Sequence, residues 1–197
     1  MDRLCPGPSP RYIACQLKGK SMRRLILAAS LVLIAASAGA QPRPGVSTLQ
    51  MDSDHSTVTA TMSAANAQFG IVAGAMEYNS IKPEESTIAL SLDTTSIVEK
   101  PARDAFDAEH FPELRISSSA AAKKGSDGRE ALPTNVTIRD ITRPVIFQVT
   151  YRDVGNNVIA LHAEGTVRSA DFKMIGKSGD VQLVIDAPFN RTGSDQR

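Results

Sequence analysis

The sequence predicts an all-β, antiparallel fold behind an export signal. Apolar and polar residues alternate with period two in several short segments, a pattern typical of strands that bury one face. Clusters of Gly, Asn, Asp, Ser and Pro separate these segments and mark turns. Short antiparallel strands at this spacing are typical of a sandwich or a barrel, and the alternation alone does not separate the two.

The N-terminal forty residues have the pattern of a secretory leader. A basic stretch between residues 18 and 24 precedes the apolar run Leu25–Ala36, and Ala38-Gly39-Ala40 offers small residues for cleavage. The apolar run is shorter than the ~20 residues that a membrane-spanning helix needs. We therefore expect residues 1–40 to be a leader and signal peptide, cut after Ala40. The mature chain is then expected in the periplasm without stable membrane insertion, and Met22 is an alternative to Met1 as the start.

Cleavage changes the charge balance and the cysteine content. Residues 1–40 hold six of the 22 Lys and Arg and one of the 21 Asp and Glu, which leaves 16 basic and 20 acidic side chains and a formal charge of −4. This mild acidity argues against nucleic acid as a partner. Both cysteines, Cys5 and Cys15, precede the cut, so the mature chain has no disulfide and no cysteine–metal site.

The expected elements follow in order along the mature chain. Residues 41–50 hold two prolines and a glycine and predict a flexible N-terminal segment, followed by one domain over 51–190 and a tail over 191–197. The main alternating runs are 57–62, 87–92, 145–152, 159–163 and 181–185. The segment Gly155-Asn156-Asn157 between two of these runs predicts a hairpin loop. A single short helix is expected over Ala102–Glu109, between two prolines.

Enzyme chemistry finds no support in the motifs. A serine hydrolase would need a Gly-x-Ser-x-Gly elbow, and the chain has none. The three histidines, His55, His110 and His162, are too far apart in sequence to form a local metal chelate. His55 follows Asp52 closely, which predicts a local turn hydrogen bond, and His162 lies on the polar side of its strand. We therefore expect no catalytic residue, no cofactor and no metal.

Three short blocks in a fixed order resemble the YceI-like family. They are Ala105–Pro112, Thr137–Val145 and Arg168–Phe172, and they follow an Asp54-His55-Ser56 opening. The resemblance extends from about Met51 to Asn190. It implies an antiparallel lipocalin-like β-barrel of about eight strands with one short helix, in a family of periplasmic proteins that bind polyisoprenoid lipids. It also places a strand at Ser118–Lys124, a segment whose alanines alone would equally allow a helix.

The resemblance implies that the inward apolar stripe of the barrel holds the tail of an isoprenoid-type lipid. The candidate ligand-binding residues are Val58, Ala60, Met62, Met76, Ile88, Leu90, Leu92, Phe106, Phe111, Ile138, Phe147, Leu161, Phe172, Leu183 and Ile185. Among these, Phe106, Phe111 and Phe172 are expected at the mouth or the floor of the barrel. Arg168 and Asp171 are expected to form a structural turn with an ion pair. The expected function is non-catalytic binding of an isoprenoid quinone or a polyprenyl derivative, and a homodimer stays open.

A second interpretation of the same stripe is an ordinary protein core. Met76 and Ala105 stand where the family usually has aromatic residues, and the loops between Met76 and Ser86 and between Ile97 and Phe106 are short. Fewer aromatics and shorter loops would narrow or shorten the lumen. The alternative function is therefore a barrel with a collapsed lumen that acts as a structural or protein-interaction module.

Overall fold

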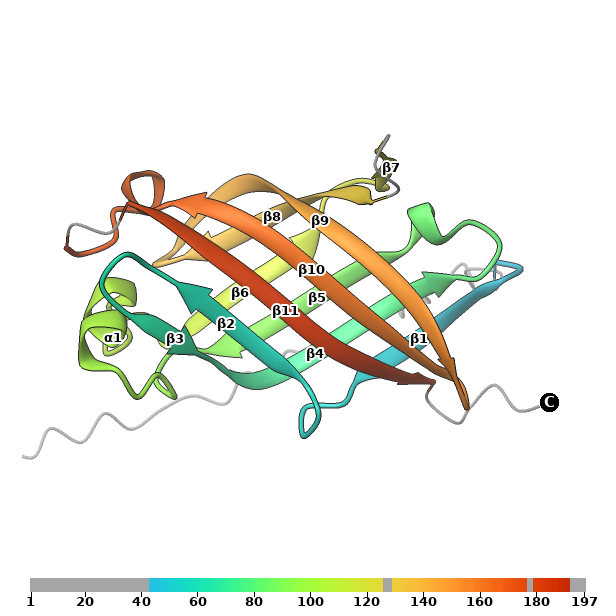
Figure 1. Cartoon of the computed structure of the whole chain (residues 1–197), viewed down its shortest axis with the longest axis horizontal. Coiled ribbons are helices and arrows are strands. Elements are labelled where there is room, and N and C mark those ends of the chain that lie inside the picture. Colours follow the sequence, from blue (N-terminus) through green and yellow to red (C-terminus); the bar gives the residue numbers. More distant parts are fainter. Residues whose placement is uncertain (1–42, 126–128, 177–178, 192–197) are drawn as a thin grey trace, which may run out of the picture. The chain divides into compact units, whose positions relative to one another are not determined.

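The computed structural model describes residues 43–125, 129–176 and 179–191, in which eleven strands surround one apolar core (Figure 1). The strands are β1 (Val46–Met51), β2 (Thr57–Thr61), β3 (Asn66–Gln68), β4 (Gly70–Asn79), β5 (Thr87–Asp93), β6 (Glu113–Ser118), β7 (Lys123–Lys124), β8 (Glu130–Ile138), β9 (Ile141–Gly155), β10 (Val158–Arg168) and β11 (Asp180–Arg191). The described residues also contain one α-helix, α1 (Lys100–Phe106), and two 3-10 turns, η1 (Pro83–Glu85) and η2 (Ser169–Phe172). The expected signal peptide and most of the expected C-terminal tail lie outside them.

The strands close into an antiparallel barrel with eight positions around its wall. Both β1 and β2 pair with β11, so these two short strands share one position, and β3 and β4 share the next. From there β4, β5, β6, β8, β9, β10 and β11 pair in order, and β7 only extends the edge of β8. The register Leu49↔Arg191 closes the ring. Closure leaves the barrel wall without the long free edges that an open sheet exposes. The all-β barrel expected from the resemblance is thereby confirmed.

The first strand begins earlier than the sequence predicts. The expected flexible segment, residues 41–50, extends too far toward the C-terminus. The strand β1 already starts at Val46, and it pairs with β4 from Val46↔Asn79 to Gln50↔Ala75. Leu49 is 1% exposed and lies in the core, so the period-two alternation already operates there. At the other end β11 continues to Arg191, one residue beyond the expected domain. The wall of the barrel therefore uses residues from Val46 to Arg191.

Two hairpin loops show why the strands reverse where they do. The loop between β9 and β10 has Asn156 and Asn157 at φ values of 53° and 62°, and Gly155 before them is also left-handed. Two consecutive left-handed residues form a type I′ turn, whose twist matches that of the flanking strands. The hairpin loop predicted at Gly155-Asn156-Asn157 is confirmed. Arg139 and Asp140 make the same kind of turn between β8 and β9, since Ile138 pairs directly with Ile141.

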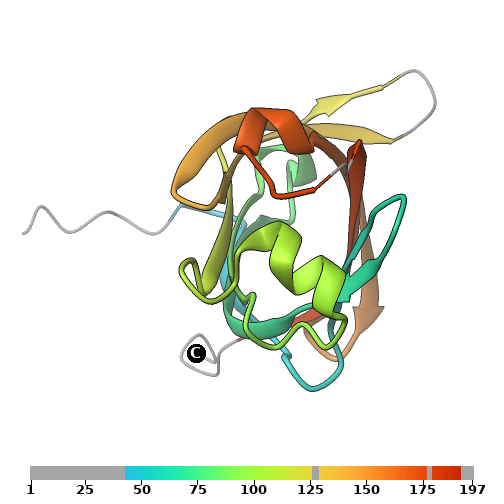
Figure 2. The ribbon, with the colours of Figure 1, turned by 90° about the vertical axis from the view of Figure 1, so that its left-hand side faces the viewer.

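One end of the barrel is covered by α1 (Figure 2). The helix begins with Pro101 in its first turn and ends where Asp107 adopts a left-handed conformation with φ of 53°. The helix expected over Ala102–Glu109 therefore ends too late, because a left-handed residue cannot continue a right-handed helix. The segment after η2 lies at the same end, since the Ile175 N–H donates to the Ala105 carbonyl at 3.2 Å. We call this the helix end.

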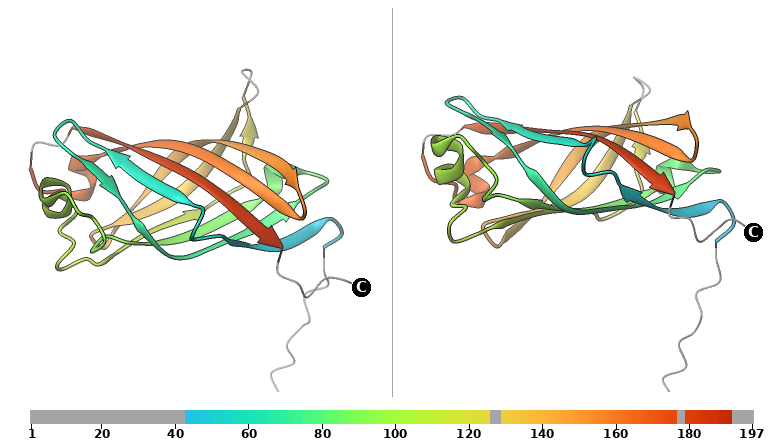
Figure 3. Two further views of the ribbon diagram at one scale, coloured as in Figure 1. Left: turned by 60° about the horizontal axis from the view of Figure 1, so that its bottom comes forward. Right: turned by 90° about the horizontal axis from the view of Figure 1, so that it is seen from below.

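The opposite end of the barrel is formed by loops, and we call it the mouth. Figure 3 shows α1 with the β2–β3 hairpin at the helix end and the last residues of β11 at the other.

The strand expected over Ser118–Lys124 is wrong for most of its length, because β6 ends at Ser118 and β7 has only two residues. The intervening chain instead contacts the β4–β5 connection, where the Ala122 N–H donates to the Glu84 carbonyl at 2.7 Å. In the part of the chain that the structure describes, no helix is long and apolar enough to span a bilayer.

Candidate functional site

The inward face of the barrel brings together nearly every residue predicted to bind a ligand. Fourteen of the fifteen candidates are at most 8% exposed and belong to one core cluster; they are Val58, Ala60, Met62, Met76, Ile88, Leu90, Leu92, Phe106, Ile138, Phe147, Leu161, Phe172, Leu183 and Ile185. Most lie on the inward faces of strands around the wall, where every second side chain points inward, whereas Phe106 belongs to α1 and Phe172 to η2. The exception is Phe111, which is half-buried after α1. The structure thus places these residues on a single apolar surface.

Large side chains already occupy part of this interior. Gly165 on β10 lies opposite Phe147 on β9, and a Cβ atom built on Gly165 would meet three Phe147 ring atoms at 2.8 Å. The absence of a side chain at Gly165 therefore leaves the space that the Phe147 ring occupies. At the helix end, Phe69 and Phe106 make an edge-to-face contact with ring centroids 5.3 Å apart. These contacts fill the space nearest the helix end.

The helix end is fixed to the barrel by an ion pair on the β8–β9 turn. Arg139 donates to Asp107 at 3.1 Å, and both side chains are less than one-fifth exposed. The guanidinium also lies over the Phe111 ring, 5.4 Å from its centroid. His110 binds the same carboxylate at 2.7 Å, and this hydrogen bond is the main reason why the pKa of Asp107 is lowered and that of His110 is raised. Phe111, predicted as a ligand contact, therefore packs against Arg139, whose ion pair with Asp107 holds the C-terminal end of α1 on the barrel.

The second expected turn at this end forms without its ion pair. Arg168 ends β10 and Asp171 lies in η2, as the predicted turn requires. Both side chains are exposed, and among the described residues no ion pair joins them. The turn instead depends on Phe172, which is 1% exposed, and on Lys173, whose φ of 50° ends the 3-10 turn. The expected Arg168–Asp171 pair is wrong because the two side chains project into solvent.

Two tyrosines meet across the barrel near the mouth. Tyr78 lies on β4 and Tyr151 on β9, which are four positions apart in the ring of eight and so stand on opposite walls. Their ring centroids are 6.2 Å apart, and both rings pack against the apolar core. The Tyr151 hydroxyl oxygen is buried and has no hydrogen-bond partner among the described residues. The pair narrows the interior at the level where the apolar stripe ends.

A carboxyl group lies beside this pair on the inward face. Glu130 opens β8 and is paired with Val149, two residues before Tyr151 on the same face of β9. Its Oε2 atom is buried and, within the described residues, also lacks a hydrogen-bond partner. Burial raises the pKa of the Glu130 carboxyl, Glu84 raises it further, and Lys124 opposes the shift. Burial likewise raises the pKa of both tyrosine hydroxyls, so each stays protonated and able to donate at neutral pH.

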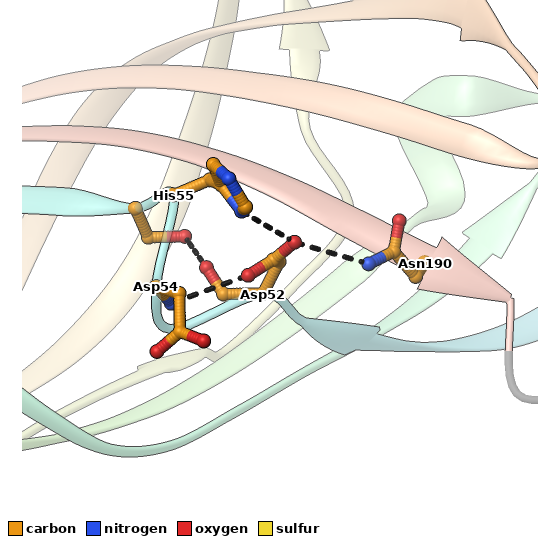
Figure 4. Close-up of polar contacts among 5 residues, drawn as sticks. Asp52, Asp54, His55 and Asn190 are labelled. Atoms are coloured by element: carbon orange, nitrogen blue, oxygen red, sulfur yellow. Dashed lines mark hydrogen bonds and ion pairs between the residues drawn. The ribbon is translucent and has the colours of Figure 1, made fainter.

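The histidines lie outside the barrel interior and have local partners. His55 donates to Asp52 at 2.9 Å in the turn between β1 and β2, where Asn190 of β11 approaches the same carboxylate at 3.4 Å (Figure 4). This confirms the predicted turn hydrogen bond, which also lowers the pKa of Asp52. His162 lies on the outer face of β10 between Asp186, at 2.6 Å, and Glu164, at 3.3 Å. Among the described residues, no three or more acidic, His or Cys side chains lie together in a group that could hold a metal ion.

A groove on the outside follows the seam beside the helix end. It has a volume of about 640 Å³ and is lined by residues of β2 and β3 and of the segment before α1, among them Phe69, Val98 and Glu99. The loop is held to the strands by side chains, since Ser96 Oγ accepts from the Gly70 N–H at 2.6 Å and Glu99 Oε2 accepts from the Asn66 N–H at 3.0 Å. These bonds satisfy backbone donors that a strand would otherwise satisfy. The groove is therefore the seam where β3 and β5 do not pair.

The polar groups of the mouth are the part of the site that sequence reasoning missed. Tyr151 lies within the predicted alternating run 145–152, but no pattern linked it to Tyr78 or Glu130, which lie on other strands. The clue in the sequence is polarity at an inward position. Glu130 continues the inward row Val136, Thr134 and Leu132 to the start of β8, where a charged side chain is unexpected unless it meets water or a ligand.

Known proteins share the fold of this barrel. The YceI-like domain model matches residues 49–189. The crystal structure of BcnA from Burkholderia cenocepacia superposes with a TM-score of 0.61 at 18% identity, covering 70% of this chain and 98% of that one. No curated protein sequence matches significantly.

Two further solved structures share the fold at lower similarity. A polyisoprenoid-binding domain from Saccharophagus degradans, described as implicated in plant cell wall breakdown, gives a TM-score of 0.51 at 6% identity over 75% of this chain and 99% of that one. A mutant of the CJ YCEI protein gives 0.52 at 15% identity over 68% of this chain and 84% of that one. At these identities the structures establish the shared fold.

Proposed function

This chain belongs to the YceI-like family, and from that premise we propose that it binds an amphipathic isoprenoid lipid, a quinone or a polyprenyl derivative, inside its barrel without catalysing a reaction on it. The observation that supports the proposal most is the continuous apolar inward face of a closed barrel that ends in polar groups at the mouth. The family is one of lipid-binding proteins, and the related domain from Saccharophagus degradans is described as polyisoprenoid-binding.

An isoprenoid tail needs apolar surface and no reactive group. Burial of apolar area contributes about 25 cal/mol per Å², so a few hundred square ångströms of tail suffice for tight binding. The inward side chains named above are apolar on every wall of the barrel. We place the protein in the periplasm, where the expected signal peptide would deliver it, and propose neither a cofactor nor a metal for it.

A second candidate function is a filled barrel that serves as a structural or protein-interaction module. The dense packing of Phe147 over Gly165 and of Phe69 against Phe106 favours it, because these rings occupy interior space that a tail would need. The two functions make opposite predictions for an isoprenoid added to the purified protein. A lipid carrier binds it in the interior, whereas a filled barrel does not.

Tyrosine emission offers a direct titration of the interior. The chain has no tryptophan, and from Gln41 onward its only tyrosines are Tyr78 and Tyr151, both near the mouth. Ubiquinone-8 added in dilute detergent should quench their emission in a saturable way if it enters the barrel. Emission that changes only as much as that of free tyrosine would contradict the proposed function.

A blocking variant locates the bound lipid. Ala163 is fully buried on the inward face of β10, and Ala163→Leu should weaken quinone binding by about 10-fold, equivalent to ~1.4 kcal/mol. Thr166→Leu places the same side chain on the outer face of β10 and serves as the matched control. Far-UV circular dichroism checks that both variants fold, and Ala60→Val provides a milder block in β2. Equal affinity in the inward and outward variants would place the lipid outside the barrel.

A further inference from the structure

The mouth contains two buried polar atoms that no protein group satisfies. They are the Tyr151 hydroxyl oxygen and Glu130 Oε2, and within the described residues neither has a hydrogen-bond partner. Buried polar atoms are nearly always paired in folded proteins, since an unpaired one loses its hydration without compensation. Two such atoms on neighbouring strands, at the end of the apolar interior, indicate a partner that arrives from outside the chain.

The geometry restricts what this partner is. Glu130 and Tyr151 are diagonal neighbours on the inward face of β8 and β9, and the Glu130 carboxylate acts electrostatically on the Tyr151 hydroxyl. The Tyr78 ring, across the barrel, provides an aromatic surface beside them. A group that satisfies both atoms accepts a hydrogen bond from the Tyr151 hydroxyl and donates one to the Glu130 carboxylate, as a hydroxyl group does, and it is attached to an apolar chain.

The charges around the mouth argue against an anion. The acidic side chains Glu84 and Asp153 act electrostatically on Glu130 and Tyr78, and both oppose a negative ligand. The basic side chains of the surrounding strand ends and loops are all exposed, and Lys82 is paired with Glu85 at 2.8 Å; they are Arg43, Lys82, Lys123, Lys124, Arg129, Arg152 and Arg191. A phosphate headgroup would lose its hydration against carboxylates without gaining a buried cation.

We infer that Tyr151 and Glu130 select isoprenoid lipids with an uncharged hydroxyl headgroup, such as that of a prenyl alcohol or a quinol, over lipids with a phosphate headgroup. This inference rests on the proposed function and assigns its specificity to two named residues. Tyr151 donates its hydroxyl hydrogen to the headgroup oxygen, and the Tyr78 ring lies beside the headgroup. Glu130 accepts the hydrogen of the headgroup hydroxyl and repels an anion.

Two lipids with the same tail and different headgroups test the inference. Undecaprenol and undecaprenyl phosphate present a hydroxyl and a phosphate, squalene is a shorter isoprenoid without a polar group, and competition for the ubiquinone-8 quenching signal measures each affinity. The wild-type chain should prefer undecaprenol to undecaprenyl phosphate by roughly 10-fold or more. Tyr151→Phe removes one hydroxyl and should weaken undecaprenol binding by about 5- to 10-fold while it leaves squalene binding unchanged.

The second variant separates charge from hydrogen bonding. Glu130→Gln keeps a polar group of the same size and removes the negative charge, so it should reduce the discrimination against undecaprenyl phosphate by at least about 3-fold. Thr150→Val and Glu77→Gln make the same chemical changes on the outer faces of β9 and β4 and should change no affinity. Thermal melts confirm that each variant is folded.

The outcomes distinguish the inference from the function on which it rests. If all three lipids bind with similar affinity and Tyr151→Phe changes nothing, the barrel is a lipid carrier whose headgroup specificity does not lie at Tyr151 and Glu130, and the inference is wrong. If undecaprenyl phosphate binds more tightly than undecaprenol, the sign of the selection is wrong. If none of the probes binds, the proposed function and the inference fail together.

Discussion

The contact between Gly165 and Phe147 gives a quantitative prediction about the barrel interior. A Cβ atom at Gly165 would lie 2.8 Å from three atoms of a ring that is fully buried and cannot turn away. Gly165→Ala therefore forces an overpacked core, which costs ~1–3 kcal/mol. The lower entropy of the unfolded alanine chain offsets ~0.4–1 kcal/mol of this cost. We expect a net destabilisation of about 1–2 kcal/mol.

Equilibrium unfolding in urea, followed by far-UV circular dichroism, measures this change. The same free energy corresponds to a fall in Tm of roughly 2–8 °C for a domain of this size. Gly179→Ala is the matched control, because no atom lies within 4 Å of a Cβ atom at Gly179. The control should leave the free energy of unfolding within about 0.5 kcal/mol of the wild type.

A double-mutant cycle tests the assigned cause. Phe147→Leu shortens the side chain that the new methyl group meets, so it should relieve the strain of Gly165→Ala. The double variant should be more stable than the sum of the two single changes by about 1 kcal/mol or more. Strict additivity would refute the reasoning, since the cost of Gly165→Ala would then arise from something other than the Phe147 ring.

Three further predictions concern packing, a turn and pH. Leu183→Ala removes a fully buried side chain and should cost about 2–5 kcal/mol in urea unfolding, whereas Val72→Ala, at a position 65% exposed, should cost under about 0.5 kcal/mol. Asn157→Gly relieves a left-handed residue in a type I′ turn and should raise the urea midpoint, while Asn157→Val should lower it by an amount corresponding to ~1–2 kcal/mol. Hydrogen bonds to Asp107 and Asp186 raise the pKa of His110 and His162 in the folded state. Their contribution to stability should therefore be complete below about pH 6.5 and lost as the pH rises through the raised values, and a variant with both histidines changed to Gln should lack this decline.

The alternation of the sequence was sufficient to predict most of the interior. Each predicted run, such as Val181–Ile185, keeps the face that the pattern assigned to it, because a strand in a barrel has one buried and one exposed side. Phe111 is the exception among the predicted residues. Phe111 lies between α1 and β6 and not within a strand, so the period-two alternation makes no prediction about the direction of its side chain.

The features that the sequence did not predict depend on contacts between distant strands. Tyr78 and Tyr151 are 73 positions apart, and only the closure of the ring brings them face to face. The early start of β1 at Val46 escaped prediction because the prolines before it suggested a flexible leader, although Leu49 already follows the inward alternation. Local patterns determine which side of a strand is buried, whereas the register of closure determines which buried groups meet.

The central claim is that the barrel encloses an isoprenoid lipid with a neutral headgroup. Native mass spectrometry of the protein purified from the cells that produce it, followed by organic extraction, tests it most directly. The account predicts a one-to-one apolar adduct whose extracted mass is that of an isoprenoid without phosphate, and a smaller adduct population in Tyr151→Phe. A protein that has only its polypeptide mass and ignores added ubiquinone-8 would contradict the account and support a filled barrel.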